Sequence, residues 1–209
     1  MKPGTLAVIG LSAFLVAWYI AGRLYNRRRG QRVRRWLLAG LDVLGGEREE
    51  GWIGSPATGA RINVTRAEPP FRRLEITFLL ANREIPLLWL ADHLRGRRDR
   101  VIIRATLRSP RRGEVRVGSG RRAERQEESW TWQEGPHGLT VGHAGRGAQR
   151  RASALQPWIE TYGVHLDRFF WRKRDPHITL QAKIGGLLEL SAATFLTDLS
   201  VALKANEKT

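Results

Sequence analysis

The sequence contains no cysteine, and this absence excludes three kinds of chemistry at once. Disulfide bonds, thiolate metal sites and cysteine nucleophiles all need a side chain that the chain does not supply. Lysine is also scarce, because only five of the 36 basic residues are lysine and the other 31 are arginine. Acidic residues number only 20, which leaves a net charge of +16. Such an excess indicates a polyanionic partner, nucleic acid or anionic lipid, although G/C-rich codon usage explains the arginine content equally well.

Charged residues are missing altogether from residues 3–22. A helix of about 20 apolar residues is about 30 Å long, which matches the hydrocarbon thickness of a bilayer. Trp18 and Tyr19 lie near one end of this segment, where aromatic rings favour the headgroup layer. Residues 1–24 are therefore predicted to form a transmembrane anchor.

A block of arginine follows the predicted anchor directly, whereas only Lys2 and the amino terminus precede it. The block consists of Arg23, Arg27, Arg28, Arg29, Arg32, Arg34 and Arg35. The positive-inside rule then predicts a single-pass protein of the cell membrane, with its N-terminus outside and its C-terminal domain in the cytosol. A cleaved signal peptide is the main alternative, but it needs its positive charge before the apolar segment rather than after it.

Residues 25–51 are predicted to be a basic juxtamembrane segment, made of an amphipathic helix and a linker. Apolar residues recur at helical spacing here, at Val33, Leu37, Gly40, Leu41 and Leu44. With Trp36 next to two arginines, the helix is typical of one that lies on anionic lipid. A helix that packs on the domain and exposes a basic face is the alternative. The sequence GGEREEG at residues 45–51 indicates a flexible linker.

Residues 52–209 are predicted to form one α+β domain, since about 150 residues can bury a core without disulfides. Apolar and polar residues alternate with period two over several segments, which is typical of strands with one buried face. These segments are residues 60–66, 72–80, 100–108, 115–117, 130–132, 139–141 and 177–183. The pattern predicts an antiparallel or mixed sheet of six to seven strands, with an apolar face and an arginine-rich polar face.

Two to three helices are expected to cover the apolar face of this sheet. A proline in the first turn and a glycine as stop signal bound a helix at residues 86–95. A longer helix is predicted for residues 150–172, where large apolar residues recur at helical spacing. Residues 187–204 also fit a helix, although a hairpin strand is an open alternative for residues 187–192.

No catalytic, metal-binding or cofactor-binding motif stands out in the sequence. The five histidines lack metal-ligand spacing, and there is no HExxH. Residues 118–123 match a GxGxxA pattern, but that motif needs a parallel strand and helix unit, which the alternation does not indicate. We therefore expect no catalytic residue, no metal and no cofactor, and an interaction protein rather than an enzyme. An enzyme whose site is built from scattered residues is the third hypothesis.

Two clusters of basic and aromatic residues are the candidate surfaces for lipid or a partner. Their members are Arg27, Arg28, Arg29, Arg32, Arg34, Arg35, Trp36, Arg168, Trp171, Arg172, Lys173 and Arg174. Aromatic side chains between cations suit a membrane interface or single-stranded bases. The alternative for residues 168–174 is a helix end whose aromatic side chains complete the core and whose cations favour the helix C-terminus.

The sequence as a whole favours a membrane-tethered cytosolic interaction module. Such a module would be an accessory or assembly component of a membrane complex, with a protein partner in the membrane and its basic surfaces near anionic lipid headgroups. A membrane-tethered nucleic-acid-binding protein is the alternative, supported by charge. In that case arginines of the polar sheet face would carry the affinity, among them Arg73, Arg104, Arg108 and Arg116.

Overall fold

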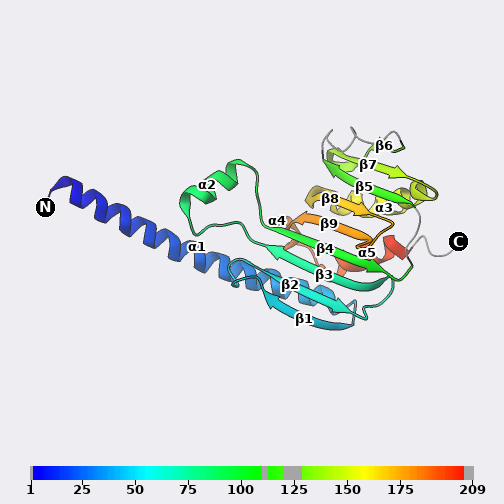
Figure 1. The fold of residues 1–209 in the computed structure, drawn as a ribbon, viewed down its shortest axis with the longest axis horizontal. Helices are drawn as coiled ribbons and strands as arrows, with labels where there is room; N and C mark the ends of the chain where they lie inside the picture. Colours follow the sequence, from blue (N-terminus) through cyan, green and yellow to red (C-terminus); the bar gives the residue numbers. More distant parts are fainter. Residues whose placement is uncertain (1, 110–112, 120–128, 205–209) are drawn as a thin grey trace.

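The computed structural model describes residues 2–109, 113–119 and 129–204, and its fold is α+β. Figure 1 shows a long N-terminal helix that leads into a domain built on one sheet. The α+β fold class and the apolar N-terminal helix agree with the sequence, whereas the sheet is larger than predicted.

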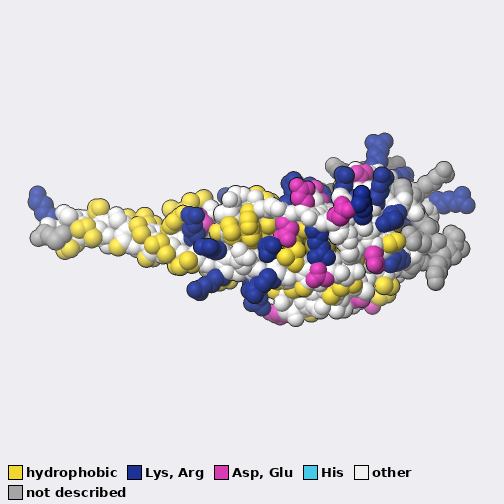
Figure 2. Space-filling view, turned by 90° about the horizontal axis from the view of Figure 1, so that it is seen from below, with side chains coloured by type: hydrophobic (Ala, Val, Ile, Leu, Met, Phe, Trp, Pro, Cys, Tyr) yellow, Lys and Arg dark blue, Asp and Glu magenta, His cyan; other side chains and the backbone are white. Residues whose placement is uncertain are grey.

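The N-terminal helix α1 (Pro3–Leu41) is one continuous element of 39 residues. Its first part projects away from the domain, and Figure 2 shows apolar side chains along it and one basic side chain, that of Lys2, at its tip. By length and composition, α1 is long and apolar enough to cross a membrane, and none of its most apolar stretch is buried. From Asn26 onward one side of α1 is buried against the domain. The predicted anchor and the predicted juxtamembrane helix therefore belong to the same helix.

The apolar stripe at the end of α1 packs on the domain. Val33 and Leu37 are each 1% exposed, and α5 (Ala192–Lys204) lies against this side of α1. Trp36 donates its indole N–H to the main-chain oxygen of Leu190, 2.7 Å away. This face is consequently not available to lipid, and the structure shows the alternative arrangement, a helix packed on the domain.

The sheet has nine strands, and all its neighbours are antiparallel. The strands are β1 (Glu47–Trp52), β2 (Gly59–Thr65), β3 (Phe71–Leu79), β4 (Arg100–Leu107), β5 (Glu114–Ser119), β6 (Thr131–Glu134), β7 (Leu139–Ala144), β8 (Leu166–Trp171) and β9 (Ile178–Lys183). Their order across the sheet is β1-β2-β3-β4-β9-β8-β5-β7-β6. The alternating segments form strands, and outside β6 their apolar residues point to the core. The expectation is wrong for residues 130–132, because β6 has no buried residue and the ring of Trp132 lies over Gly142 on the opposite face.

Two strands were not predicted, and each replaces another element. Residues 47–52, expected to be linker, pair with β2 as the edge strand β1. Its side chains are almost all exposed, so no alternation marks it in the sequence. The helix predicted to end at residue 172 ends at Tyr162, and residues 166–171 form β8 in the middle of the sheet. Phe169 is buried as predicted, but from a strand rather than from a helix.

Three helices join the end of α1 on the apolar face of the sheet: α3 (Ala148–Tyr162), α4 (Ile184–Leu187) and α5. Phe195 of α5 joins these layers, because its ring packs 6.2 Å from Trp36, 5.6 Å from Trp158 and 5.1 Å from Tyr162, measured between centroids. The C-terminal helix is thus confirmed from residue 192, and the segment before it is α4 and a turn instead of a hairpin strand.

Helix α2 (Pro86–Leu94) forms where the sequence predicts it, but it does not cover the sheet. It has no buried residue. Figure 1 shows it beyond the ends of β3 and β4, near the projecting part of α1. The expectation that it contributes to the core is wrong, because the segment between β3 and β4 is attached to α1 instead of folding back onto the sheet.

Candidate anion-binding groove

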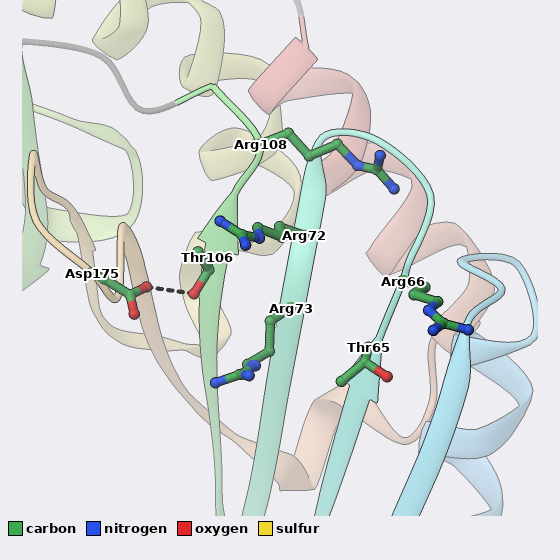
Figure 3. Close-up of a pocket in the computed structure, with 7 residues that line it drawn as sticks. All are labelled: Thr65, Arg66, Arg72, Arg73, Thr106, Arg108 and Asp175. Atoms are coloured by element: carbon green, nitrogen blue, oxygen red, sulfur yellow. Dashed lines mark hydrogen bonds between the residues drawn. The ribbon is translucent and has the colours of Figure 1, made fainter.

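The polar face of the sheet carries a groove lined by arginine. The core-facing residues of β2, β3 and β4 alternate with residues that point to the opposite face, so Arg73, Arg104 and Thr106 all lie on the uncovered side. Loops at one end of these strands add further side chains. Figure 3 shows them around a hollow of about 490 Å³. Its lining residues are Thr65, Arg66, Arg72, Arg73, Thr106, Arg108 and Asp175.

The groove continues along the sheet into a second hollow of about 490 Å³. The two hollows share Arg73, Thr106 and Asp175. The second one is lined by Arg73, Glu75, Arg104, Thr106, Arg172, Asp175, Pro176 and Thr179. We call the two together the arginine groove. It has six arginines and two carboxylates, an excess of four positive charges.

The two carboxylates of the groove are already engaged. Glu75 Oε1 lies 3.3 Å from Arg104 Nη1 and 3.7 Å from Arg61 Nε, which leaves this acid shared between two cations. Asp175 accepts a hydrogen bond from the hydroxyl of Thr106, drawn as a dashed line in Figure 3. The hydroxyl is neutral, so Asp175 keeps its charge, and the hollow that Arg72 and Arg73 line has four arginines against this one carboxylate.

The arginines of the groove differ in how firmly they are held. Arg108 is fixed, because its Nε donates to the main-chain oxygen of Phe71 at 3.1 Å and its Nη2 to that of Ala67 at 2.8 Å. Within the described residues, the guanidinium groups of Arg72 and Arg73 have no hydrogen bond or ion pair. Guanidinium groups present paired N–H donors that match the two oxygens of a carboxylate or phosphate. The groove can therefore bind such an anion through Arg72 and Arg73, whose guanidinium groups point to the same side in Figure 3.

The predicted binding residues between positions 168 and 174 do not form one surface in the structure. Trp171 is 2% exposed and packs in the core, so it is not part of a binding surface. Arg172 lies in the arginine groove, with its guanidinium 4.8 Å from the ring of Phe170. Lys173 and Arg174 follow in the exposed turn after β8. Arg168 lies at the other end of the sheet, beside Lys183 and Asp167.

The basic residues of α1 form a second group. Arg29 is paired with Asp99 at 3.0 Å and Arg34 with Glu50 at 2.7 Å, so these two hold the helix to the domain. The others are exposed and form no ion pair within the part of the chain that the structure describes: Arg27, Arg28, Arg32 and Arg35. These four are the members of the predicted group that stay available to a headgroup.

Sequence reasoning identified part of the groove. The alternation placed Arg73, Arg104 and Arg108 on the polar face, and the structure brings them together. Arg66 and Asp175 were missed because they come from loops, whose positions depend on which strands are neighbours. The described residues include no group of three or more His, Cys, Asp or Glu side chains that could hold a metal ion.

Comparison with known families and with curated proteins gives no match for this chain, so the groove is interpreted from its own geometry.

Proposed function

We propose that this chain is a single-pass membrane protein whose cytosolic domain binds an acidic segment of a partner protein in the arginine groove, as an interaction module and not as an enzyme. The exposed, apolar first part of α1 supports the anchor. The unpaired arginines that follow it, with only Lys2 before it, support the cytosolic side. The observation that carries the binding function is the pair Arg72 and Arg73, whose guanidinium groups have no ion pair within the described residues, in a hollow with four arginines and one carboxylate.

The position of the groove favours a soluble ligand over the lipid surface. It lies where β3 begins and β4 ends, whereas the other ends of these strands lead to α2 and the projecting part of α1. Strands of eight and nine residues are roughly 25–30 Å long. That length exceeds the distance of about 8 Å over which physiological salt screens a charge. Anionic headgroups around α1 would therefore contribute little to binding in the groove.

The lining of the groove favours carboxylates of a protein over nucleic acid. Single-stranded nucleic acid is usually bound by aromatic platforms as well as by cations. Neither hollow is lined by an aromatic residue. The neighbouring ring of Phe170 is 4.8 Å from the guanidinium of Arg172, so that contact already occupies it. An acidic peptide needs only the guanidinium groups.

The proposal is tested with the full chain in nanodiscs of neutral lipid, using a glutamate-rich peptide and a single-stranded oligonucleotide as probes. The double substitution Arg72→Glu with Arg73→Glu should weaken peptide binding about tenfold or more, which is about 1.4 kcal/mol. Arg146→Glu with Arg150→Glu changes the net charge equally at exposed positions outside the groove and should have a much smaller effect.

Two results would contradict the proposal. An equal loss of peptide affinity in both double variants would show that binding depends on the net charge of the chain and not on the groove. Binding of the oligonucleotide alone, sensitive to Arg72 and Arg73, would support the nucleic-acid alternative instead.

A further inference from the structure

We infer that α2 is a second membrane-contacting element: a short helix that inserts its leucines into the cytosolic leaflet, beside the membrane-spanning part of α1. The inference rests on the membrane anchoring proposed above and adds a lipid-binding site to it. The ligand is the bilayer itself, with acyl chains against the apolar side chains of α2 and anionic headgroups against the cations that follow it.

The side chains of α2 are unusually exposed for their chemistry. Leu87 and Leu94 are 77% and 78% exposed, and Leu88 and Leu90 are nearly half exposed. No residue of the helix is buried. A helix with leucine on several sides is normally covered, since apolar surface is unfavourable in water.

The position of α2 along α1 indicates that lipid covers the exposed leucines of α2. Trp89 of α2 packs on Trp18 of α1, with 5.7 Å between ring centroids, and the indole N–H of Trp18 donates to the main-chain oxygen of Arg83 at 3.0 Å. Trp18 lies four residues before Gly22, which is the last residue of the uncharged segment. Four residues of helix correspond to about 6 Å, and interfacial helices lie about 5–10 Å into the boundary between headgroups and acyl chains. The depth of α2 fits that boundary.

Close packing fixes α2 at this depth. A Cβ atom at Gly22 would lie 2.1 Å from the main-chain oxygen of Arg83, so only glycine allows this approach. Further along α1, Asn26 donates to the main-chain oxygen of Ala81 at 2.9 Å and accepts from Arg83 at 2.9 Å. The segment that carries α2 is therefore attached to α1 where the apolar part ends, and it cannot move freely away from the bilayer.

Basic residues surround α2 on the side of the domain. Arg95, Arg97 and Arg98 follow the helix directly. A basic hollow lies next to them at this end of the sheet, lined by Gly96, Arg98, Arg100, Ser119, Asp167, Arg168, Gln181 and Lys183. An apolar helix followed by cations is the usual composition of a helix in an anionic membrane interface.

The absence of cysteine makes a direct test possible, because each single substitution introduces the only thiol. Leu87→Cys and Leu94→Cys are labelled with an environment-sensitive fluorophore. Leu11→Cys in the apolar part of α1 and Val201→Cys on α5 are the controls, and all four positions are exposed in the structure. The full chain is reconstituted in vesicles of phosphatidylcholine and phosphatidylglycerol that carry nitroxide-labelled lipid, either near the headgroup or near the methyl ends.

We expect nitroxide near the headgroup to reduce the fluorescence at positions 87 and 94 about twofold or more, as for a helix in the boundary region. Position 11 should be quenched most by nitroxide near the methyl ends, and position 201 by neither. Quenching at 11 without quenching at 87 and 94 would overturn the inference and leave the anchor in place. Positions 87 and 94 shielded from iodide but not quenched by lipid would also overturn it, in favour of a protein contact. No quenching at 11 would overturn the anchor, and the inference with it.

Discussion

Arg83 and Asp99 form a bidentate ion pair, in which Nη1 and Nη2 of Arg83 donate to Oδ1 and Oδ2 of Asp99 at 2.9 and 3.1 Å. Arg29 of α1 adds a third charged hydrogen bond to the same carboxylate at 3.0 Å, and the main-chain N–H of Ala81 a fourth at 2.9 Å. Asp99 is 4% exposed. This single carboxylate therefore connects α1 to both ends of the segment that carries α2.

Removing the charge of Asp99 should release this segment. Asp99→Asn leaves Arg83 and Arg29 without their anion, and both are mostly buried. We expect a loss of about 2 kcal/mol in the free energy of unfolding, below the 3–5 kcal/mol of a fully buried pair because the arginines are about one fifth exposed. Thermal unfolding in detergent measures it. Asp92→Asn, which removes a surface pair with Arg97, should cost much less.

Acid should have the same effect as the Asp99 substitution. Burial alone would raise the pKa of Asp99, but the hydrogen bonds from Arg83, from the N–H of Ala81 and from Arg29 outweigh it and hold the pKa below its usual 3.8. The ionised carboxylate thus stabilises the fold above pH 3.8, and this stabilisation is lost as the pH falls through the lowered pKa. The difference in stability between the natural chain and Asp99→Asn should be constant near neutral pH and shrink in acid. A difference that grows on acidification would contradict the pKa direction.

Gly30 should be intolerant of any side chain, because a Cβ atom there would lie 2.0 Å from the main-chain oxygen of Pro56. We expect Gly30→Ala to lower the free energy of unfolding by about 1–3 kcal/mol, the usual cost of overpacking. Gly10→Ala is the matched control, since nothing lies within 4 Å of its added methyl group. Alanine favours helix over glycine by about 1 kcal/mol, so this control should be neutral or slightly stabilising. Similar melting temperatures for both variants would show that α1 does not approach the domain so closely.

The orientation of the chain can be measured with reporters fused to its C-terminus. If the proposed topology holds, green fluorescent protein should fluoresce there and alkaline phosphatase should be inactive, because the positive-inside rule assigns the arginines after the apolar segment to the cytosolic side. Replacing Arg27, Arg28, Arg32 and Arg35 by glutamate should raise phosphatase activity, since these exposed residues have no ion pair within the described residues. Active phosphatase on the natural chain would reverse the proposed topology.

Much of the fold followed from local pattern. A strand with one buried face is recognised by apolar residues at every second position, such as Leu74, Ile76 and Phe78 in β3. The pattern was misleading where a spacing fits two structures, as in residues 166–171, whose apolar residues extend a helical stripe and also alternate as a strand. β1 gave no signal, because an exposed edge strand has no buried residues to alternate with its polar ones.

The candidate site was less predictable than the fold. The arginine groove depends on strand order, since Asp175 comes from the turn before β9 and reaches Thr106 because β9 lies next to β4. No local pattern contains that neighbour relation. The position of α2 likewise depends on Asp99 and Arg83, two polar residues in loops on either side of it.

The continuity of α1 also determines the direction in which the domain faces. A flexible linker would let the arginine groove turn freely relative to the apolar part of α1. An unbroken helix of 39 residues instead fixes the rotation of the domain about the helix axis. Each residue of an α-helix turns by about 100° around the axis. In the proposed membrane arrangement, the groove therefore faces a fixed side relative to whatever packs against the apolar part of α1. A partner that binds both would meet the two surfaces in one defined geometry.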